Sequence, residues 1–250
     1  MRTLVAAAWL VLLTARGSQP SVAPVPVLVE LFTSEGCSSC PAADALLASL
    51  QREQPISGGH VIALGLHVDY FDHEGWKDTF SSPAYTDRQR GYSAQFGPGS
   101  VYTPQMVIDG REAVEGNDGD RVRRAIAAAA KRPHWPVAVS ARVADDRVLV
   151  RIELPAAPSA AEKIQILTAI TQDDLTTAVK RGENGGRTLH HVAVARRLQA
   201  IGFLARQPGV VERELKVDRK WGAGALKAVA WLQGVASRHV YGAAIIPVGG

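Results

Sequence analysis

The sequence is poor in the residues and patterns that identify several large classes of protein. It has two cysteines in 250 residues, and without a second CxxC motif a metal site would have to recruit histidines. Beyond residues 4–13, no apolar run approaches transmembrane length. No basic stretch is interleaved with aromatic residues, so we expect no nucleic-acid partner. The chain also lacks internal repeats and low-complexity segments.

The N-terminus has the layout of a secretory signal peptide. A basic start at Arg2 is followed by an apolar run over residues 4–13 and by small residues up to Ala23. Such a run reaches about 15 Å as a helix, roughly half of a bilayer core, so we expect cleavage near Gly17 or Ala23. We therefore predict residues 1–23 as a signal peptide. The mature protein would be periplasmic or secreted, without a stable membrane anchor after cleavage.

The first half of the mature chain alternates strand and helix patterns. The predicted elements are strands at 25–31, 60–68, 101–108 and 111–114 and helices that begin near residues 41, 83 and 118. Asp109 and Gly110 predict a type I′ hairpin turn between the last two strands. The resulting order is β, α, β, α, β, β, α.

Past residue 132 the pattern changes to repeated β-rich runs. They cover residues 137–143, 148–154, 164–170, 189–196, 211–217, 226–232 and 240–248. Runs of this length and spacing indicate an antiparallel sandwich. The charge also changes, because residues 24–130 carry 8 Lys and Arg against 14 Asp and Glu, whereas residues 131–250 carry 18 against 10. We therefore predict two domains, at residues 24–132 and 133–250.

The two cysteines lie in the motif Cys37-Ser38-Ser39-Cys40, where the first strand passes into a helix. A CxxC motif at such a junction is typical of thiol–disulfide exchange. The positive end of the helix and its unpaired N–H groups stabilise a thiolate. We expect Cys37, as the exposed member, to be the nucleophile and Cys40, one turn inside the helix, to resolve the mixed disulfide.

Other interpretations of the cysteine pair stay open. A structural disulfide suits an exported protein, although a loop of two residues removes little unfolded-state entropy. A metal site would need histidines as its further ligands, and the candidates are His67, His73, His190 and His191. The corresponding functions are a non-catalytic binding module of the cell envelope and a metal- or copper-handling chaperone.

These features together resemble the thioredoxin-like superfamily. The resemblance rests on the CxxC motif after the first strand, on Thr103-Pro104 at the start of the third, and on the hairpin at 107–110. It implies an α/β thioredoxin-like domain followed by a smaller all-β sandwich-like domain. It also implies a cis peptide bond at Pro104, close to the dithiol, where the preceding backbone pairs with a substrate chain.

Longer strings narrow the resemblance to an uncharacterised family of secreted bacterial proteins with a thioredoxin-like domain. These strings are residues 29–37, 67–70, 75–78, 88–89 and 181–189, and the similarity spans nearly the whole mature chain. Residues Cys37, Cys40 and Pro104 would be catalytic, with Thr103 in a supporting position. The implied partners are protein thiols or disulfides, and we expect no cofactor and no bound metal.

Some residues depart from working thioredoxins. Gly36 stands where a tryptophan usually precedes the first cysteine. Glu30 is the nearest match to their buried acid, which helps proton transfer at the second cysteine, but the strand register could point it outward. Glu35 lies two residues before Cys37, where a carboxylate would oppose thiolate formation. Residues 70–96 form an insertion that we expect to cover or shape the substrate groove.

Two further segments have more than one interpretation. A cation could be bound by His67, Asp69, Asp72 and His73, but we favour the alternative in which His67 is a buried strand residue and the other three cap the loop. The glycine-rich segment 181–187 could bind an anion or could simply be a turn between strands. The sequence as a whole favours an exported thiol–disulfide oxidoreductase.

Overall fold

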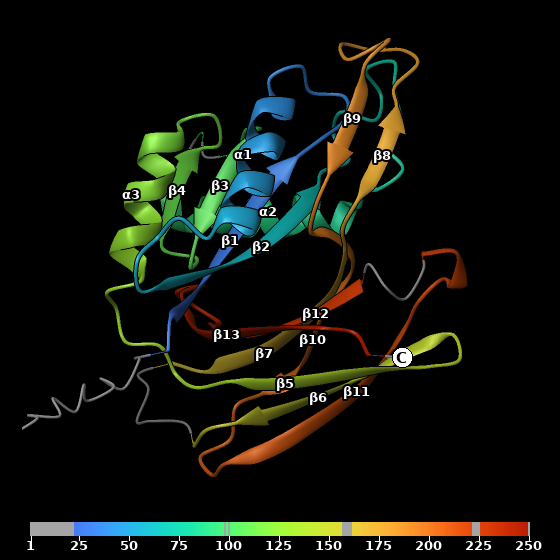
Figure 1. Cartoon of the computed structure of the whole chain (residues 1–250). Helices are drawn as coiled ribbons and strands as arrows, with labels where there is room; N and C mark the ends of the chain where they lie inside the picture. The colour runs from blue at the N-terminus through green and yellow to red at the C-terminus, as the bar shows by residue number, and fades with distance from the viewer. Residues whose placement is uncertain (1–22, 98, 100, 157–161, 222–225, 250) are drawn as a thin grey trace, which may run out of the picture.

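The computed structural model describes residues 23–97, 99, 101–156, 162–221 and 226–249 (Figure 1). The expected signal peptide, residues 1–23, therefore lies outside the described residues, except for its last position. Within the described ranges, no helix is both long and apolar enough to cross a membrane.

The first seven elements follow the predicted order. They are β1 (Val25–Thr33), α1 (Cys40–Glu53), β2 (Gly59–His67), α2 (Pro83–Phe96), β3 (Gln105–Ile108), β4 (Glu112–Glu115) and α3 (Gly119–Ala129). Helix α2 begins where Ser82 accepts a hydrogen bond from the backbone of Ala84 and proline takes the first turn. The hairpin turn has positive φ at Asp109 and Gly110, +48° and +61°, as its type I′ sequence predicts.

The rest of the described chain is almost entirely β-structure. Its elements are β5 (Ala138–Ala144), β6 (Arg147–Leu154), β7 (Ile164–Gln172), β8 (Leu175–Ala178), β9 (Thr188–His191), β10 (Val194–Phe203), β11 (Gly209–Lys216), a 3₁₀ turn at Arg219–Trp221, β12 (Leu226–Gly234) and β13 (Val240–Pro247). The seven predicted runs all contain strands. The strand β8 and the break between β9 and β10 were not predicted.

The predicted fold, an α/β thioredoxin-like domain followed by a smaller all-β sandwich-like domain, is wrong. Strands from both halves of the chain share one mixed eight-stranded sheet in the order β13-β12-β7-β10-β2-β1-β3-β4. The described chain is mostly β, with three α-helices among these strands. The predicted domain boundary at residue 132 falls between α3 and β5. The eight-stranded sheet contains strands from both sides of this boundary.

The two halves of the sheet join at Gly65. Val194 of β10 pairs there in parallel with β2, and the Gly65 N–H donates a 2.8 Å hydrogen bond to the Ala193 carbonyl. A Cβ atom at position 65 would lie 3.3 Å from the Val192 carbonyl oxygen, so the absence of a side chain permits this approach. The apolar pattern of β2 therefore reflects a central strand, one of whose neighbours is supplied by the second half.

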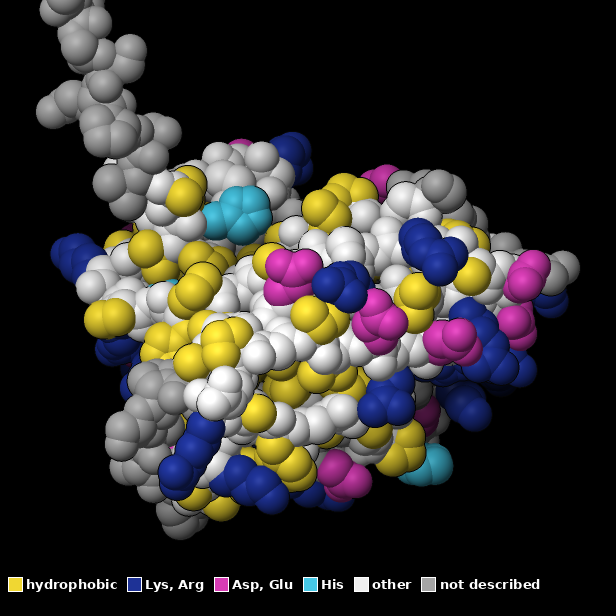
Figure 2. Space-filling model, turned by 90° about the horizontal axis from the view of Figure 1, so that it is seen from below, with side chains coloured by type: hydrophobic (Ala, Val, Ile, Leu, Met, Phe, Trp, Pro, Cys, Tyr) yellow, Lys and Arg dark blue, Asp and Glu magenta, His cyan; other side chains and the backbone are white. Residues whose placement is uncertain are grey.

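The helices and the small sheets complete the layers around this sheet. Helices α1 and α3 cover one face of β1, β2 and β3, and α2 packs on the other face with residues of β7, β10 and β12. A three-stranded sheet, β11-β6-β5, packs over β7 and β12. Strands β8 and β9 form a separate hairpin that stands beside α1 in Figure 1. From the side of the three-stranded sheet, basic and acidic side chains are interspersed rather than gathered by sign (Figure 2).

Candidate functional site

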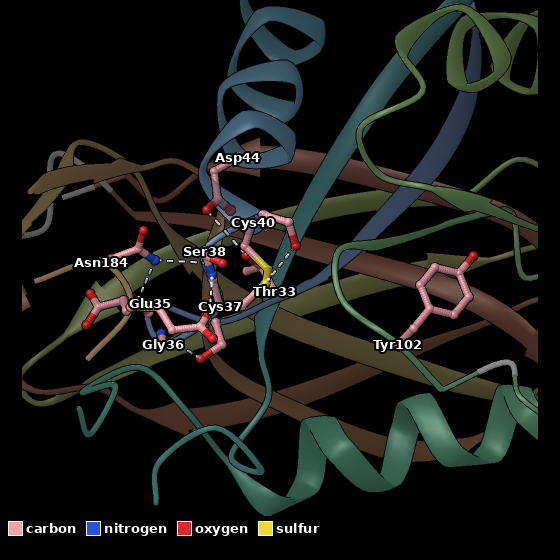
Figure 3. The surroundings of a disulfide bond; sticks show 12 residues. Thr33, Glu35, Gly36, Cys37, Ser38, Cys40, Asp44, Tyr102 and Asn184 are labelled. Carbon is pink, nitrogen blue, oxygen red and sulfur yellow. Dashed lines mark hydrogen bonds between the residues drawn. A yellow bond between two sulfur atoms is a disulfide. The ribbon is translucent and has the colours of Figure 1, made fainter. Parts of the chain in front are cut away.

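A disulfide joins Cys37 and Cys40 at the start of α1 (Figure 3). Pro41 occupies the first helical turn, where its missing N–H leaves no hydrogen bond unmade. The exposed fractions of Cys37 and Cys40 are 2% and 0%, whereas Ser38 and Ser39 between them are exposed. The expectation that Cys37 is the exposed cysteine is therefore wrong, and the disulfide lies just beneath the surface.

The glycine-rich loop 181–187, between β8 and β9, contacts the cysteine loop, residues 35–40. The buried Asn184 amide donates 2.9 Å hydrogen bonds to the carbonyl oxygens of both Glu35 and Cys37. Glu183 accepts a 2.9 Å hydrogen bond from the Ser38 N–H. In Figure 3, Asn184 lies on one side of the disulfide. Of the two roles predicted for this loop, a turn between strands describes its backbone, and its side chains clamp the CxxC motif.

The insertion after β2 supplies a second cover. Its Trp76 indole N–H donates a 2.7 Å hydrogen bond to the Glu35 carboxylate, and Asp78 accepts a 2.9 Å hydrogen bond from the Glu35 N–H. The two covering loops touch, because a Cβ atom on Gly182 would lie 3.1 Å from the Cβ of Trp76. The segment 70–96 therefore covers the chain that leads into Cys37.

Beneath the cysteine loop lies a cluster of five buried ionisable side chains: Glu35, Asp44, His67, Asp78 and His191. His67 and Asp78 are in contact through Nδ1 and Oδ2, 2.7 Å apart. His191 lies 3.4 Å from the Glu35 carboxylate and 3.8 Å from the Asp44 carboxylate. Neither His191 ring nitrogen has a hydrogen-bond partner. The cluster thus links the segment before Cys37 to the helix after Cys40.

Burial and mutual attraction shift the pKa values of three members of this cluster, His67, Asp78 and Asp44. Burial alone would lower the pKa of His67, but the neighbouring Asp78 carboxylate outweighs it and raises that pKa above its usual range. In the same way, burial would raise the pKa of Asp78, but His67 lowers it. Burial raises the pKa of Asp44 despite the opposing attraction of His191. Among these groups, Asp44 is therefore held toward its neutral form.

Asp44 is the residue of this cluster that belongs to the cysteine helix. It follows Cys40 by four positions in α1, so the two side chains project from the same face of the helix (Figure 3). The Thr33 hydroxyl donates a 3.3 Å hydrogen bond to its carboxylate. Sequence reasoning missed Asp44, although an acid one helical turn beyond Cys40 was a visible signal.

Pro104 follows a cis peptide bond from Thr103, as the resemblance implied. Its carbonyl accepts a 2.9 Å hydrogen bond from the Gly116 N–H. A Cβ atom on Gly116 would lie 3.0 Å from the Cβ atoms of both Pro104 and Ala43. The proline therefore lies close to the first turns of α1, and Thr103 before it is half-buried.

Glu30 lies on the opposite face of β1 from the cysteine helix. It forms a buried ion pair with Arg88 of α2 at 2.5 Å and accepts a hydrogen bond from the Tyr92 hydroxyl. Arg88 also donates a 3.1 Å hydrogen bond to Gln233 of β12. Burial would lower the pKa of Arg88, but the Glu30 carboxylate outweighs it and raises that pKa. The structure therefore places Glu30 in a junction between the two halves and away from the disulfide.

The residues considered as metal ligands have other partners. Asp69 accepts a hydrogen bond from Thr86, and Asp72 accepts hydrogen bonds from Asp78 and Ser81, so both acids organise the loop after β2. His73 is exposed. Within the described ranges, no group of three or more His, Cys, Asp or Glu side chains is arranged to hold a metal ion.

Comparisons with known proteins find similarity to one family model and to solved structures. A family model described as a protein of unknown function (DUF1223) matches residues 28–233. A crystal structure of an Agrobacterium tumefaciens protein is 28% identical, with a TM-score of 0.70, over 92% of this chain and 97% of that one. HBP35 of Porphyromonas gingivalis is 13% identical, with a TM-score of 0.68, over 91% of this chain and 76% of that one, and this likeness concerns the fold alone. The comparison with curated proteins finds no match.

Proposed function

Because this chain belongs to the family of proteins of unknown function DUF1223, the family supplies no activity, and we propose one from the site: an exported thiol–disulfide oxidoreductase. Its substrates would be protein thiols or disulfides in the periplasm or outside the cell. The proposed likeness to the thioredoxin-like superfamily is limited to the local arrangement of the CxxC motif and the cis-proline.

The observation that carries the proposal is the position of the cysteine pair at the N-terminus of α1. The Ser39 side chain makes no capping hydrogen bond there, so it does not occupy the backbone N–H groups of the first turn. Its hydroxyl instead contacts the Cys37 sulfur at 3.4 Å. Hydrogen-bond donors and the positive end of the helix would stabilise a Cys37 thiolate. A disulfide used only as a staple needs none of these features.

The exchange balances as two displacements. A substrate thiolate attacks the Cys37 sulfur, the Cys37–Cys40 bond breaks, and Cys40 leaves as a thiolate that takes up a proton. A second substrate thiolate then attacks the substrate sulfur of the mixed disulfide and releases Cys37. The substrate dithiol loses two electrons and two protons; the protein disulfide gains the two electrons, one proton goes to Cys40, and the other goes to solvent. Asp44 is suited to exchange the Cys40 proton, because it is buried on the same helical face and its pKa is raised.

Exchange requires the covering loops to open. Cys37 is only 2% exposed, and Asn184 and Trp76 hold the backbone on either side of it. Access would therefore depend on loop 181–187 and on the insertion, which are placed to select which substrates reach the sulfur.

The same burial favours a second candidate, a non-catalytic binding module with a locked disulfide. In that case the Asn184 clamp would be permanent and the disulfide would serve only to fix the loop. The metal- or copper-handling alternative gains no support from the described residues, since no three or more His, Cys, Asp or Glu side chains among them are arranged to hold a metal ion.

Trapping experiments separate the two candidates. In the oxidoreductase, Cys40→Ser should accumulate a mixed disulfide when it is given a peptide disulfide, because the Cys37 thiolate attacks that disulfide, releases one peptide thiol and is left with no Cys40 to resolve the bond, whereas Cys37→Ser should form none. The readout is mass spectrometry after equilibration in glutathione buffers. If both variants lose stability equally and neither traps a partner, the disulfide is structural and the binding module is the better description.

A further inference from the structure

A cavity of about 460 Å³ opens between α1 and β9, next to the cysteine pair. One wall is a stripe of α1 that begins at Pro41, directly after Cys40, and continues through Ala45 and Ala48 to Arg52. Three small side chains at helical spacing leave a trough along the helix. Its volume lies in the range of about 300–1,000 Å³ that is usual for ligand sites.

The other wall comes from the second half of the chain. It includes the apolar side chains of Leu189 and Val192 and the polar side chains of Arg187, Thr188 and His190. Strand β9 runs beside α1 in Figure 1, so the trough has helix on one side and strand on the other. An apolar floor with a few polar groups at its rim is typical of a recognition site.

The charge of the lining is positive. The exposed Arg52 and Arg187 contribute two guanidinium groups. Asp44 is the one carboxyl group among the described lining residues, and it is buried, so the exposed charges of the lining are the two guanidinium groups. Glu53 pairs with Arg52 at 2.7 Å, but both groups are exposed and the arginine keeps free donors. The trough therefore suits an anionic ligand.

The length of the trough sets the size of that ligand. From Pro41 to Arg52 the helix advances about 16 Å at ~1.5 Å per residue. An extended peptide advances ~3.3 Å per residue, so about five residues would span the trough. Arg187 hydrogen-bonds to Asn184 at 2.8 Å and thus lies near the disulfide end, whereas Arg52 lies at the far end.

We propose that the trough between α1 and β9 binds an extended acidic peptide segment of the substrate protein, adjacent to the cysteine that exchanges with Cys37. As an assignment of substrate class, this rests on the proposed oxidoreductase function. The apolar floor holds the peptide, and Arg187 and Arg52 pair with carboxylates spaced along it. Substrates with acidic residues beside the reacting cysteine are preferred over basic ones.

Binding is tested without redox chemistry by calorimetry on the oxidised protein. The probes are three six-residue peptides that carry serine in place of cysteine. They are identical except at two positions, which are both Glu, both Gln or both Lys. The Glu peptide should bind most tightly, with an affinity that falls as salt concentration rises. Arg52→Gln should weaken it by up to about fivefold, the range of an exposed ion pair. Arg90→Gln, an exposed arginine of α2 outside the trough, should have no effect.

A second pair of variants tests the trough by shape. Ala48→Phe fills it and should reduce binding of the Glu peptide more than about tenfold, since the peptide loses its apolar floor. Ala42→Phe, on the same helix but exposed and outside the lining, is the matched control. Equal binding of the Glu and Lys peptides, or undiminished binding to Ala48→Phe, would overturn the proposal.

Cysteine forms of the same peptides separate this proposal from the function on which it rests. If the serine peptides show the acidic preference but no cysteine peptide forms a mixed disulfide, the trough is confirmed and the oxidoreductase fails. If all cysteine peptides react at equal rates and the serine peptides do not bind, the oxidoreductase stands and the trough fails.

Discussion

The amide of Asn184 donates a 2.9 Å hydrogen bond to the carbonyl oxygen of Cys37, 147 residues earlier in the chain. The same amide also bonds to Glu35, so one side chain of the second half fixes both residues around Gly36. The contact makes access to the disulfide depend on the second half of the chain.

Asn184→Ala should therefore expose the disulfide. It removes two buried hydrogen bonds, each worth about 0.5–1.5 kcal/mol, so local opening should become about tenfold more frequent. The measurement is the rate at which dithiothreitol reduces the Cys37–Cys40 bond. Glu183→Ala is the matched comparison: it removes an exposed hydrogen bond to Ser38 from the same loop and should change the rate much less. Equal acceleration by both would contradict a clamp centred on Asn184.

Asp44→Asn should change the titration of Cys40. In a Cys37→Ser background, the ultraviolet absorbance of the thiolate reports the pKa of Cys40 alone. The amide cannot become a carboxylate, so the thiolate loses a like-charged neighbour and the pKa of Cys40 should fall. Glu53→Gln makes the same change of charge at an exposed site of the same helix. A Cys40 pKa that responds to neither substitution would remove Asp44 from the proton exchange.

His67→Gln should destabilise the protein in a pH-dependent way. The folded pKa of His67 is raised, so its contribution is complete below the unfolded value near 6.5 and is lost as pH rises through the folded value. The folded pKa of Asp78 is lowered, so its contribution is lost only as pH falls below about 3.9, through the folded value. The loss in free energy of unfolding should be greatest between about pH 4 and 6.5, near 3–5 kcal/mol.

Urea unfolding of wild type and variant across that pH range provides the measurement for His67. His190→Gln is the control, because His190 is an exposed histidine of β9 whose Nδ1 lies 3.2 Å from the Thr176 hydroxyl. A constant difference between wild type and His67→Gln from pH 4 to pH 9 would show that the His67–Asp78 pair is not ionised.

Gly65→Val should weaken the junction between the halves of the large sheet. Its Cβ would lie 3.3 Å from the Val192 carbonyl, and the added methyl groups would crowd β10 further. Overpacking of this kind costs about 1–3 kcal/mol, measurable as a lower urea midpoint. Gly209→Val in β11 meets nothing within 4 Å and should leave the midpoint unchanged or raise it. An unchanged urea midpoint for Gly65→Val would mean that β2 and β10 can separate without loss of stability.

The local structure of this protein was largely predictable from its sequence. Alternating apolar residues, the Ser82-Pro83 start and the Asp109-Gly110 turn specified elements whose hydrogen bonds lie close in the chain. The same local signals located Cys37 and Cys40 at a helix start, and the resemblance located the cis bond before Pro104. The strands, helix starts and turn depend on neighbours within a few residues, so they can be recognised without knowledge of the fold, whereas the cis bond was implied by the resemblance alone.

The tertiary structure decided which segments meet. An apolar strand such as β2 shows that both its faces are buried, but its periodicity does not say that β10 pairs with it through Gly65. Likewise, nothing near His191 or Asn184 in the sequence indicates that both side chains lie beside the cysteine loop. Strand pairing and buried polar contacts between distant segments depend on the packing of the whole chain, and this is why the fold and the surroundings of the disulfide emerged only from the structure.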